Sequence, residues 1–262
     1  FVDSIPPIIT VTSPTATSYA TKNNNSLSMN ISISFTSDSS GSLWYSSDGG
    51  ATNVSYSSPV NKNFVLVSGD SDLCVPIECL CQNEFNSLIK SPFLIKWFVQ
   101  NTRMQYNSKI IQLPIGLDYH TVGENQTHYW KLKNESYLPK DQELTLISIK
   151  QESKPFFERN IKIYANFSMG NDRFNDRKDS LNKIPTDLLE YHNYFIKRTD
   201  NWKNIINYAF VLCPFGNGMD CHRSWEALCL GSIPIIKAPY FKKLFEDLPV
   251  LIVNEWNEIT KE

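Results

Sequence analysis

Several side chains that could bind or transfer charge gather in residues 215–236, which read FGNGMDCHRSWEALCLGSIPII. An apolar run at 210–214 comes first, a Gly-Asn-Gly loop follows, and a helix is expected to start near Asp220. The N-terminus of a helix presents unpaired N–H groups and a partial positive charge, which suit phosphate. Glycines let the backbone approach a ligand closely, and Arg223 can form two parallel hydrogen bonds with a diphosphate. The stretch therefore predicts an anion site.

Glu226 lies three residues after Arg223, on the same face of the expected helix. Its carboxylate could accept hydrogen bonds from two ribose hydroxyls. Three simpler interpretations remain open: an ordinary Gly-Asn-Gly turn, an N-cap at Asp220, and an exposed Arg223–Glu226 ion pair. His222 and Glu226 have metal-ligand spacing but no third ligand nearby. The stretch also differs from G-x-x-x-x-G-K-[ST] and G-x-G-x-x-G, so an ATPase or a dehydrogenase is disfavoured.

Composition excludes other classes of function. The chain has 262 residues, 41% of them hydrophobic, which is enough for one large domain or two small ones. A net charge of −2 gives no general attraction to nucleic acid or acidic membranes. No apolar run approaches the roughly 18–20 residues of a membrane span. The six cysteines match no zinc pattern, and we expect buried or free thiols, with one or two disulfides as the alternative.

The composition changes near residue 59. Residues 1–58 hold 23 Ser or Thr and one basic residue, Lys22, whereas the other 24 basic residues follow. Polar and apolar residues alternate at 28–35, and an Asp-Gly turn follows 42–47. Both patterns predict short, half-exposed strands in a Ser/Thr-rich β segment. A flexible stretch is expected around 21–26.

From residue 60 onward, apolar runs alternate with amphipathic ones. We expect strands at 64–68, 109–118, 160–168, 193–197, 210–214, 233–237 and 250–254. We expect helices at 175–184, 199–209, 219–231 and 240–248, the second capped by Thr199 or Asp200. The first strand should be buried; residues 85–99 have mixed helical periodicity, and the polar residues 119–141 should form an excursion or connection. The alternation predicts an α/β fold with a doubly wound parallel sheet.

A family resemblance supports this interpretation. PFGNGMDCHRSWEALCLGSIPII, followed by FEDLPVLIVNEWNEIT, resembles the C-terminal signature of exostosin-like glycosyltransferases, family 47 and its relatives. These relatives include ribitol xylosyltransferases and sugar transferases of large DNA viruses. FVLVSGDSD, IKWFVQN, KIIQLPIGLD and YANFS follow in the order that the group shows. The resemblance covers about residues 60–262 and is specific in 209–256, and residues 1–58 match nothing.

The resemblance implies a GT-B fold, in which two Rossmann-like halves face a cleft. Residues 59–141 would form the acceptor half and residues 142–262 the nucleotide-sugar half, with the β-rich segment 1–58 packed on the first. Such enzymes need no metal and no cofactor, because side chains and a helix N-terminus neutralise the leaving diphosphate. The donor would be a UDP-sugar, and pentoses such as xylose are among the sugars it could carry. The acceptor would be a glycan or glycoprotein. A cellular relative would act in the Golgi lumen, and a viral one in the host cytoplasm.

The family inverts the anomeric centre, which implies one general base. Asp72 is the first candidate, and Asp118 and His120 come next. GDSD contains an Asp-x-Asp that binds metal in the other main glycosyltransferase fold, but here it follows a strand of the acceptor half. The expected substrate-binding residues are Asn166, Arg173, Arg177, Gly216, Asn217, Gly218, Asp220, His222, Arg223 and Glu226.

Two other classes remain as alternatives. The first is a noncatalytic carbohydrate-binding protein whose platform would be Trp44 and Tyr45 in the β-rich segment, although 58 residues are few for an independent sandwich. The second is another transferase, or a phosphatase, that uses the same anion-binding loop. Glycoside hydrolysis would need paired carboxylates, which the sequence does not show.

Overall fold

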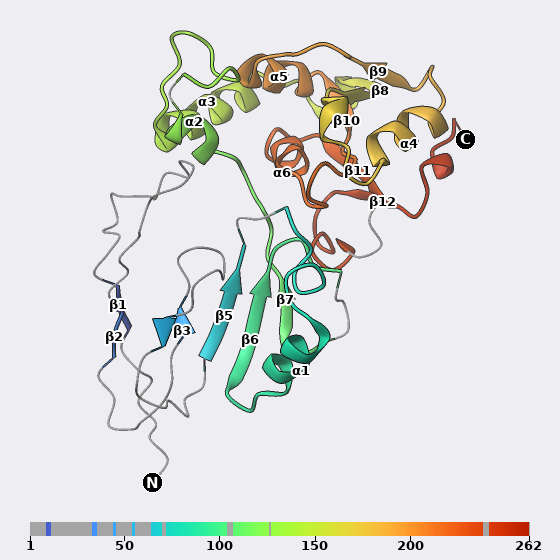
Figure 1. Cartoon of the computed structure of the whole chain (residues 1–262). Coiled ribbons are helices and arrows are strands. Elements are labelled where there is room, and N and C mark those ends of the chain that lie inside the picture. The colour runs from blue at the N-terminus through green and yellow to red at the C-terminus, as the bar shows by residue number, and fades with distance from the viewer. Residues whose placement is uncertain are drawn as a thin grey trace. The chain divides into compact units, whose positions relative to one another are not determined.

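The computed structural model describes residues 9–11, 33–35, 44–45, 54–55, 64–69, 72–103, 107–125, 127–237 and 241–261 (Figure 1). The chain divides into two compact units, Phe1–Phe64 and Val65–Glu262. In the first unit, β1 (Ile9–Val11) pairs antiparallel with β2 (Ile33–Phe35), and β3 (Trp44–Tyr45) pairs antiparallel with β4 (Val54–Ser55). Strands are therefore present within 28–35 and 42–47, whereas the flexible stretch expected at 21–26 lies outside the described residues.

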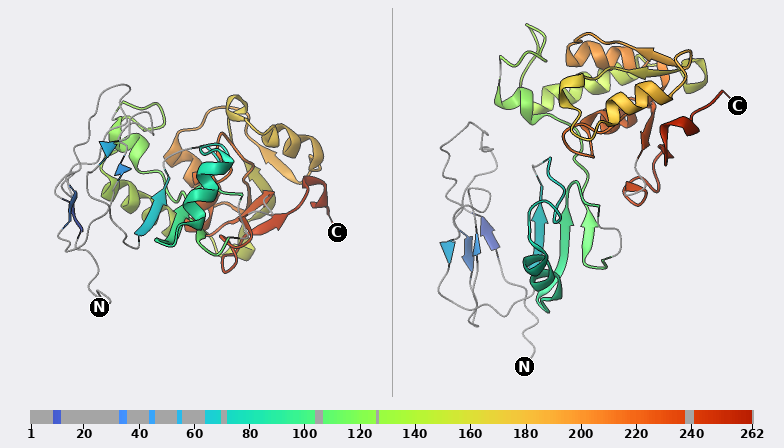
Figure 2. Two further views of the ribbon diagram at one scale, coloured as in Figure 1. Left: turned by 60° about the horizontal axis from the view of Figure 1, so that its bottom comes forward. Right: turned by 45° about the vertical axis from the view of Figure 1, so that its right-hand side comes forward.

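A three-stranded sheet opens the second part of the chain. Its order is β5 (Phe64–Ser68), β6 (Leu94–Val99), β7 (Ile110–Gln112), and β6 and β7 are parallel. Helix α1 (Gln82–Lys90) lies against one face (Figure 2), where its apolar side chains pack on Trp97 and Val99. Leu66 packs into this cluster, whereas Val65 and Val67 are 51% and 63% exposed. The expectation of a wholly buried β5 is therefore wrong.

The larger sheet has five strands: β8 (Asn160–Ala165), β9 (Leu189–Tyr191), β10 (Tyr208–Leu212), β11 (Ile233–Lys237) and β12 (Leu251–Val253). Every neighbouring pair is parallel, and the order is β12-β11-β10-β8-β9. Four helices accompany it: α3 (Pro139–Gln151), α4 (Asp176–Lys183), α5 (Arg198–Ile205) and α6 (His222–Cys229).

Successive strand residues point to opposite faces of this sheet, and both faces are covered. Val211 belongs to a core that includes residues of α3, α5 and α6, whereas Leu212 belongs to one that includes Ile184, just after α4, and Trp256 of the 3-10 turn η4 (Trp256–Glu258). Parallel strands buried on both faces explain the continuous apolar runs of the sequence. The architecture is mixed α/β, with parallel strands in sheets of three and five, and is compatible with a Rossmann-like fold.

Some expected elements differ. The strand expected at 193–197 is absent; the chain instead forms β9 at Leu189–Tyr191 and then a loop. No α-helix forms in the described residues 241–248, which make turns anchored in the core by Phe241 and Phe245. The mixed segment 85–99 resolves into the end of α1 and strand β6, with Pro92 between them, because proline disfavours helical backbone in the residue before it.

The segment 119–141 contains a short helix, α2 (His120–Glu124), and the start of α3. Helix α3 was not expected, and the boundary expected between residues 141 and 142 falls inside it. Helix α3 packs against α5. The N-cap of α5 is Lys197, so capping by Thr199 or Asp200 is wrong.

All six cysteines lie in the described residues and are free thiols. Among the described helices, none has both the length and the apolar character needed to cross a bilayer.

Candidate functional site

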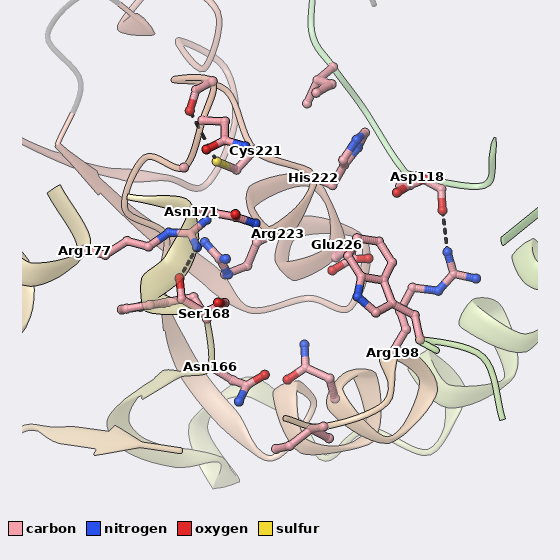
Figure 3. Close-up of a pocket in the computed structure, with 18 of the residues that line it drawn as sticks. Asp118, Asn166, Ser168, Asn171, Arg177, Arg198, Cys221, His222, Arg223 and Glu226 are labelled. Atoms are coloured by element: carbon pink, nitrogen blue, oxygen red, sulfur yellow. Dashed lines mark hydrogen bonds between the residues drawn. The ribbon is translucent and has the colours of Figure 1, made fainter. Parts of the chain in front are cut away.

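The strand order of the larger sheet indicates where a ligand would bind. Numbered by their own order along the chain, the five strands lie 2-1-3-4-5, so the order reverses between β8 and β10. In open α/β sheets, ligands bind beyond the carboxyl ends of the strands at this point. A cavity of about 370 Å³ is lined by residues of the loops that follow β8 and β10. Figure 3 shows this cavity with its lining side chains.

The cavity brings together nearly all of the site residues expected from the sequence. Those that line it are Asp72, Asp118, Asn166, Arg177, Gly216, Asn217, Gly218, Asp220, His222, Arg223 and Glu226. Two expected residues do not line it. Arg173 pairs with Glu78 at 2.5 Å, and His120 is 54% exposed beside Asp118.

Two arginines meet in the cavity without a carboxylate partner. Arg177 donates from Nε to the Phe215 carbonyl (3.1 Å) and from Nη1 to the Ser168 carbonyl, and Arg223 makes a long contact of 3.4 Å with the Pro214 carbonyl. Both guanidinium groups lie over the Phe167 ring, 5.7 and 5.2 Å from its centre. Among the described residues, neither forms an ion pair within 4 Å.

These charges lie close enough to affect one another. Arg177 is only 6% exposed, and burial, followed by repulsion from Arg223, lowers its pKa to about 10. Holding two cations close together in a buried place costs free energy, and it leaves a positive potential in the cavity. A dianionic ligand such as a diphosphate would remove the repulsion and would gain charge-assisted hydrogen bonds.

The two loop glycines are required by side chains that approach from elsewhere in the chain. A Cβ atom on Gly216 would lie 2.6 Å from Nη2 of Arg177. A Cβ atom on Gly218 would lie 2.9 Å from Nδ2 of Asn101 and 3.1 Å from Oδ1 of Asp72. The glycines therefore let Arg177 and Asp72 reach the loop, a role that differs from the expected close approach of backbone to ligand.

Asp220 holds the loop in place and does not cap the helix. Its carboxylate accepts hydrogen bonds from the backbone N–H of Ile115 (2.7 Å) and from Nε1 of Trp225 (2.9 Å). It is 4% exposed, and burial raises its pKa to about 6. The N-cap of α6 is Cys221, which makes no side-chain capping bond. The expected N-cap at Asp220 is therefore wrong, and the first turn of α6 begins without a side-chain cap.

His222 is fixed by one ring nitrogen. Its Nδ1 lies 2.7 Å from the carbonyl oxygen of Gly116, which can only accept, so Nδ1 carries the proton. In the neutral ring, Nε2 is then an acceptor. The rings of His120 and His222 are 5.9 Å apart.

Glu226 is buried at the cavity and is not an exposed partner of Arg223. It is 8% exposed, and burial raises its pKa to about 7, whereas the nearby indole of Trp202 and the charges of Arg198 and Arg223 lower it. Nε1 of Trp202 is buried and has no hydrogen-bond partner of normal geometry within the described residues. The interpretation of Arg223 and Glu226 as a surface ion pair is wrong, because no such pair forms.

The three candidates for a general base have different environments. Asp72 lines the cavity and is exposed to solvent. Asp118 is 3% exposed, and its Oδ1 accepts from the backbone N–H of Thr121 (2.9 Å) and lies 3.1 Å from Nδ1 of His120. The other carboxylate of the GDSD motif, Asp70, lies outside the described residues.

Asn166 positions a loop. Its Nδ2 donates to the carbonyls of His192 (2.9 Å) and Tyr194 (3.0 Å), which fixes the chain after β9. The amide nitrogen that a glycan would occupy in this Asn-Phe-Ser sequon is therefore already engaged.

Sequence reasoning missed one charged group and several aromatic groups. Arg198 lines the cavity, is 8% exposed, donates to the Asp118 carbonyl and to Oε1 of Gln142, and stacks on Trp202 at 4.9 Å. Its Nε is buried without a partner among the described residues. Tyr129, Trp130 and Phe195 also line the cavity. The available signal was an arginine in the first turn of a helix, since Arg198 is the first residue of α5. The strand expected at 193–197 and the helix expected at 199–209 left it outside both elements.

Within the part of the chain that the structure describes, no three His, Cys, Asp or Glu side chains gather as metal ligands. Compared with protein-family models and with curated proteins, the chain matches no family model and no curated protein.

Proposed function

We propose that the cavity binds the diphosphate of a nucleotide-sugar and that the chain is an inverting glycosyltransferase of the GT-B type. The observation that carries the proposal is the pair of guanidinium groups, Arg177 and Arg223, which share one phenyl ring and have no carboxylate partner among the described residues. They lie beside the uncapped first turn of α6, at the point where the strand order reverses.

The exostosin-like pattern of residues 209–256 is the reason for preferring a nucleotide-sugar over another diphosphate. Arg177 and Arg223 would neutralise the nucleoside diphosphate as it leaves, which is the role a metal ion has in other transferases. Glu226 would accept hydrogen bonds from the ribose hydroxyls, one helical turn after Arg223. No cofactor enters this scheme, and the acceptor is a glycan or glycoprotein hydroxyl.

Inversion needs one group to take the proton of the acceptor hydroxyl as that oxygen attacks the anomeric carbon. Asp72 is preferred, because its carboxylate lies against Gly218 at the cavity, whereas that of Asp118 already accepts from Thr121 and contacts His120. Asp118 and His120 are the next candidates. If His120 is the base, Asp118 would orient its imidazole.

Thermal unfolding in the presence of UDP, GDP, CMP and free oligosaccharides tests the proposal. A nucleotide at 100 times its Kd stabilises the folded state by about 2.7 kcal/mol, which corresponds to roughly 5–10 °C for a protein of this size. Stabilisation by a nucleoside diphosphate is expected, followed by sugar transfer from the matching nucleotide-sugar in excess EDTA. Stabilisation by free glycan alone would favour a carbohydrate-binding protein, and a strict manganese requirement would contradict the proposed mechanism.

A further inference from the structure

Two large aromatic side chains line the cavity while remaining open to solvent. Tyr129 is 63% exposed and Phe195 is 56% exposed, and both belong to the cavity lining. Their rings lie 5.2 Å apart at an angle of 53°. We call these two residues the aromatic wall. Exposed aromatic groups grouped at a cavity commonly mark a binding surface, because they have apolar area that only a ligand can cover.

The aromatic wall is built from two loops that the fold fastens together. The backbone N–H of Arg198 donates to the Trp130 carbonyl (3.1 Å), and Nζ of Lys197 donates to the Lys131 carbonyl (2.7 Å). Asn166 holds the second loop through the carbonyls of His192 and Tyr194. These bonds fix the backbone on both sides of the wall, so its rings are presented in a defined place.

The wall belongs to the same cavity lining as the arginine pair. Arg223 and Glu226 are one turn apart on α6, and the charge of Arg198 acts on the carboxyl of Glu226. Figure 3 shows Arg177, Arg223, Glu226 and Arg198 following one another across the cavity. The backbone of Arg198 is bonded to Trp130, the neighbour of Tyr129. The order of anion partner, buried carboxylate and aromatic group matches the order of phosphate, ribose and base in a nucleotide.

We infer that Tyr129 and Phe195 stack on the nucleobase of the donor. The inference rests on the proposed function, because it assumes a nucleotide in the cavity. Aromatic stacking accepts any base, since every base has a π-face. An acceptor sugar is the other occupant that aromatic groups could hold. The nucleobase is preferred because the loop that carries Tyr129 is bonded to the backbone of Arg198, whose charge acts on Glu226. Asp72, the preferred general base for the acceptor, contacts the glycine loop instead.

The test compares binding of UDP and of inorganic pyrophosphate by calorimetry. Alanine removes the stacking surface, so Tyr129→Ala and Phe195→Ala should each weaken UDP binding by about 5- to 150-fold. Pyrophosphate binding should be unchanged, because it uses only the arginine pair. Tyr129→Phe and Phe195→Tyr keep the ring and should bind UDP like the parent protein. Unchanged thermal unfolding of the free variants checks that they are folded.

Tyr194→Ala is the matched control. Tyr194 is 60% exposed on the same loop, stacks on His192 and does not line the cavity, so its loss should leave UDP affinity unchanged. If UDP binds but both alanine variants of the wall retain full affinity, the inference is overturned and the proposed function stands. Loss of affinity for acceptor alone would assign the wall to the acceptor and would also overturn it. If the parent protein binds neither UDP nor pyrophosphate, the proposed function fails as well.

Discussion

Replacing Arg223 with glutamine separates a binding role from a structural one. Arg223 makes one long hydrogen bond, to the Pro214 carbonyl, and lies over Phe167, so the fold gains little from its charge. Its neighbour Arg177 is different, because it is buried and bonded to two backbone carbonyls, and its loss would leave both without a partner. Arg223→Gln is therefore the cleaner change.

The expected effect on the free protein follows from the pKa of Arg177. Lowering that pKa from 12.5 to about 10 corresponds to about 3 kcal/mol. Burial is the larger cause and repulsion by Arg223 the second, so we take the repulsion as on the order of 1 kcal/mol. Relief of this repulsion offsets the lost cation–π contact with Phe167, about 0.5–1 kcal/mol. Arg223→Gln should therefore leave the free energy of unfolding within about 1 kcal/mol of the parent value.

The effect on binding should be much larger. A charge-assisted hydrogen bond contributes about 1.5–3 kcal/mol, so UDP affinity should fall by about 10- to 150-fold. Because the pKa of Arg177 is about 10 in the folded state, its side chain is protonated in both folded and unfolded states below about pH 8, so its electrostatic cost is constant there and pH 7.5 is a suitable condition. Calorimetry with UDP and chemical unfolding of the free protein give the two quantities.

Arg173→Gln removes the same charge outside the cavity and is the matched control. Arg173 pairs with Glu78 and lies over Phe174, so its loss should leave UDP affinity unchanged. Unchanged affinity in Arg223→Gln would refute the anion site. A loss of several kcal/mol of stability in the same variant would show that Arg223 is structural.

Three further predictions concern the same cavity. Gly216→Ala should weaken UDP binding by displacing the Arg177 guanidinium, whereas Gly170→Ala, whose Cβ would meet Ser168 at an ordinary 3.5 Å, should not; equal affinities would contradict the close-approach argument. The raised pKa of Glu226 means that the parent protein loses stability as pH rises from 4.5 to about 7. The free energy of unfolding of Glu226→Gln should therefore increase relative to that of the parent across this range. Parallel pH profiles of the two proteins in chemical unfolding would contradict the prediction. Asp72→Asn should keep UDP affinity and lower turnover by about 10²-fold or more; near-normal turnover would transfer the role of base to Asp118 or His120.

The sequence alone determined the α/β class and one part of the cavity lining, the glycine loop with Arg223. Continuous apolar runs such as 210–214 and 233–237 indicate strands buried on both faces, and both are strands of the parallel sheet. The order of strand, glycine loop and helix is local in the chain. It therefore placed the loop at 216–218 and Arg223 together before any tertiary contact was known.

Only the tertiary structure brought the remaining groups to the glycine loop and its cavity. Arg177 reaches Gly216 because β8 pairs with β10, and no local pattern encodes which strands become neighbours. Asp220 has the sequence position of a helix cap, yet its carboxylate is bound by the backbone of Ile115, 105 residues away. The apolar character of 193–197 predicted a strand, but Phe195 is exposed at the cavity in a loop held by Asn166. Long-range pairing and burial decided these positions, because they depend on contacts between segments that the sequence separates.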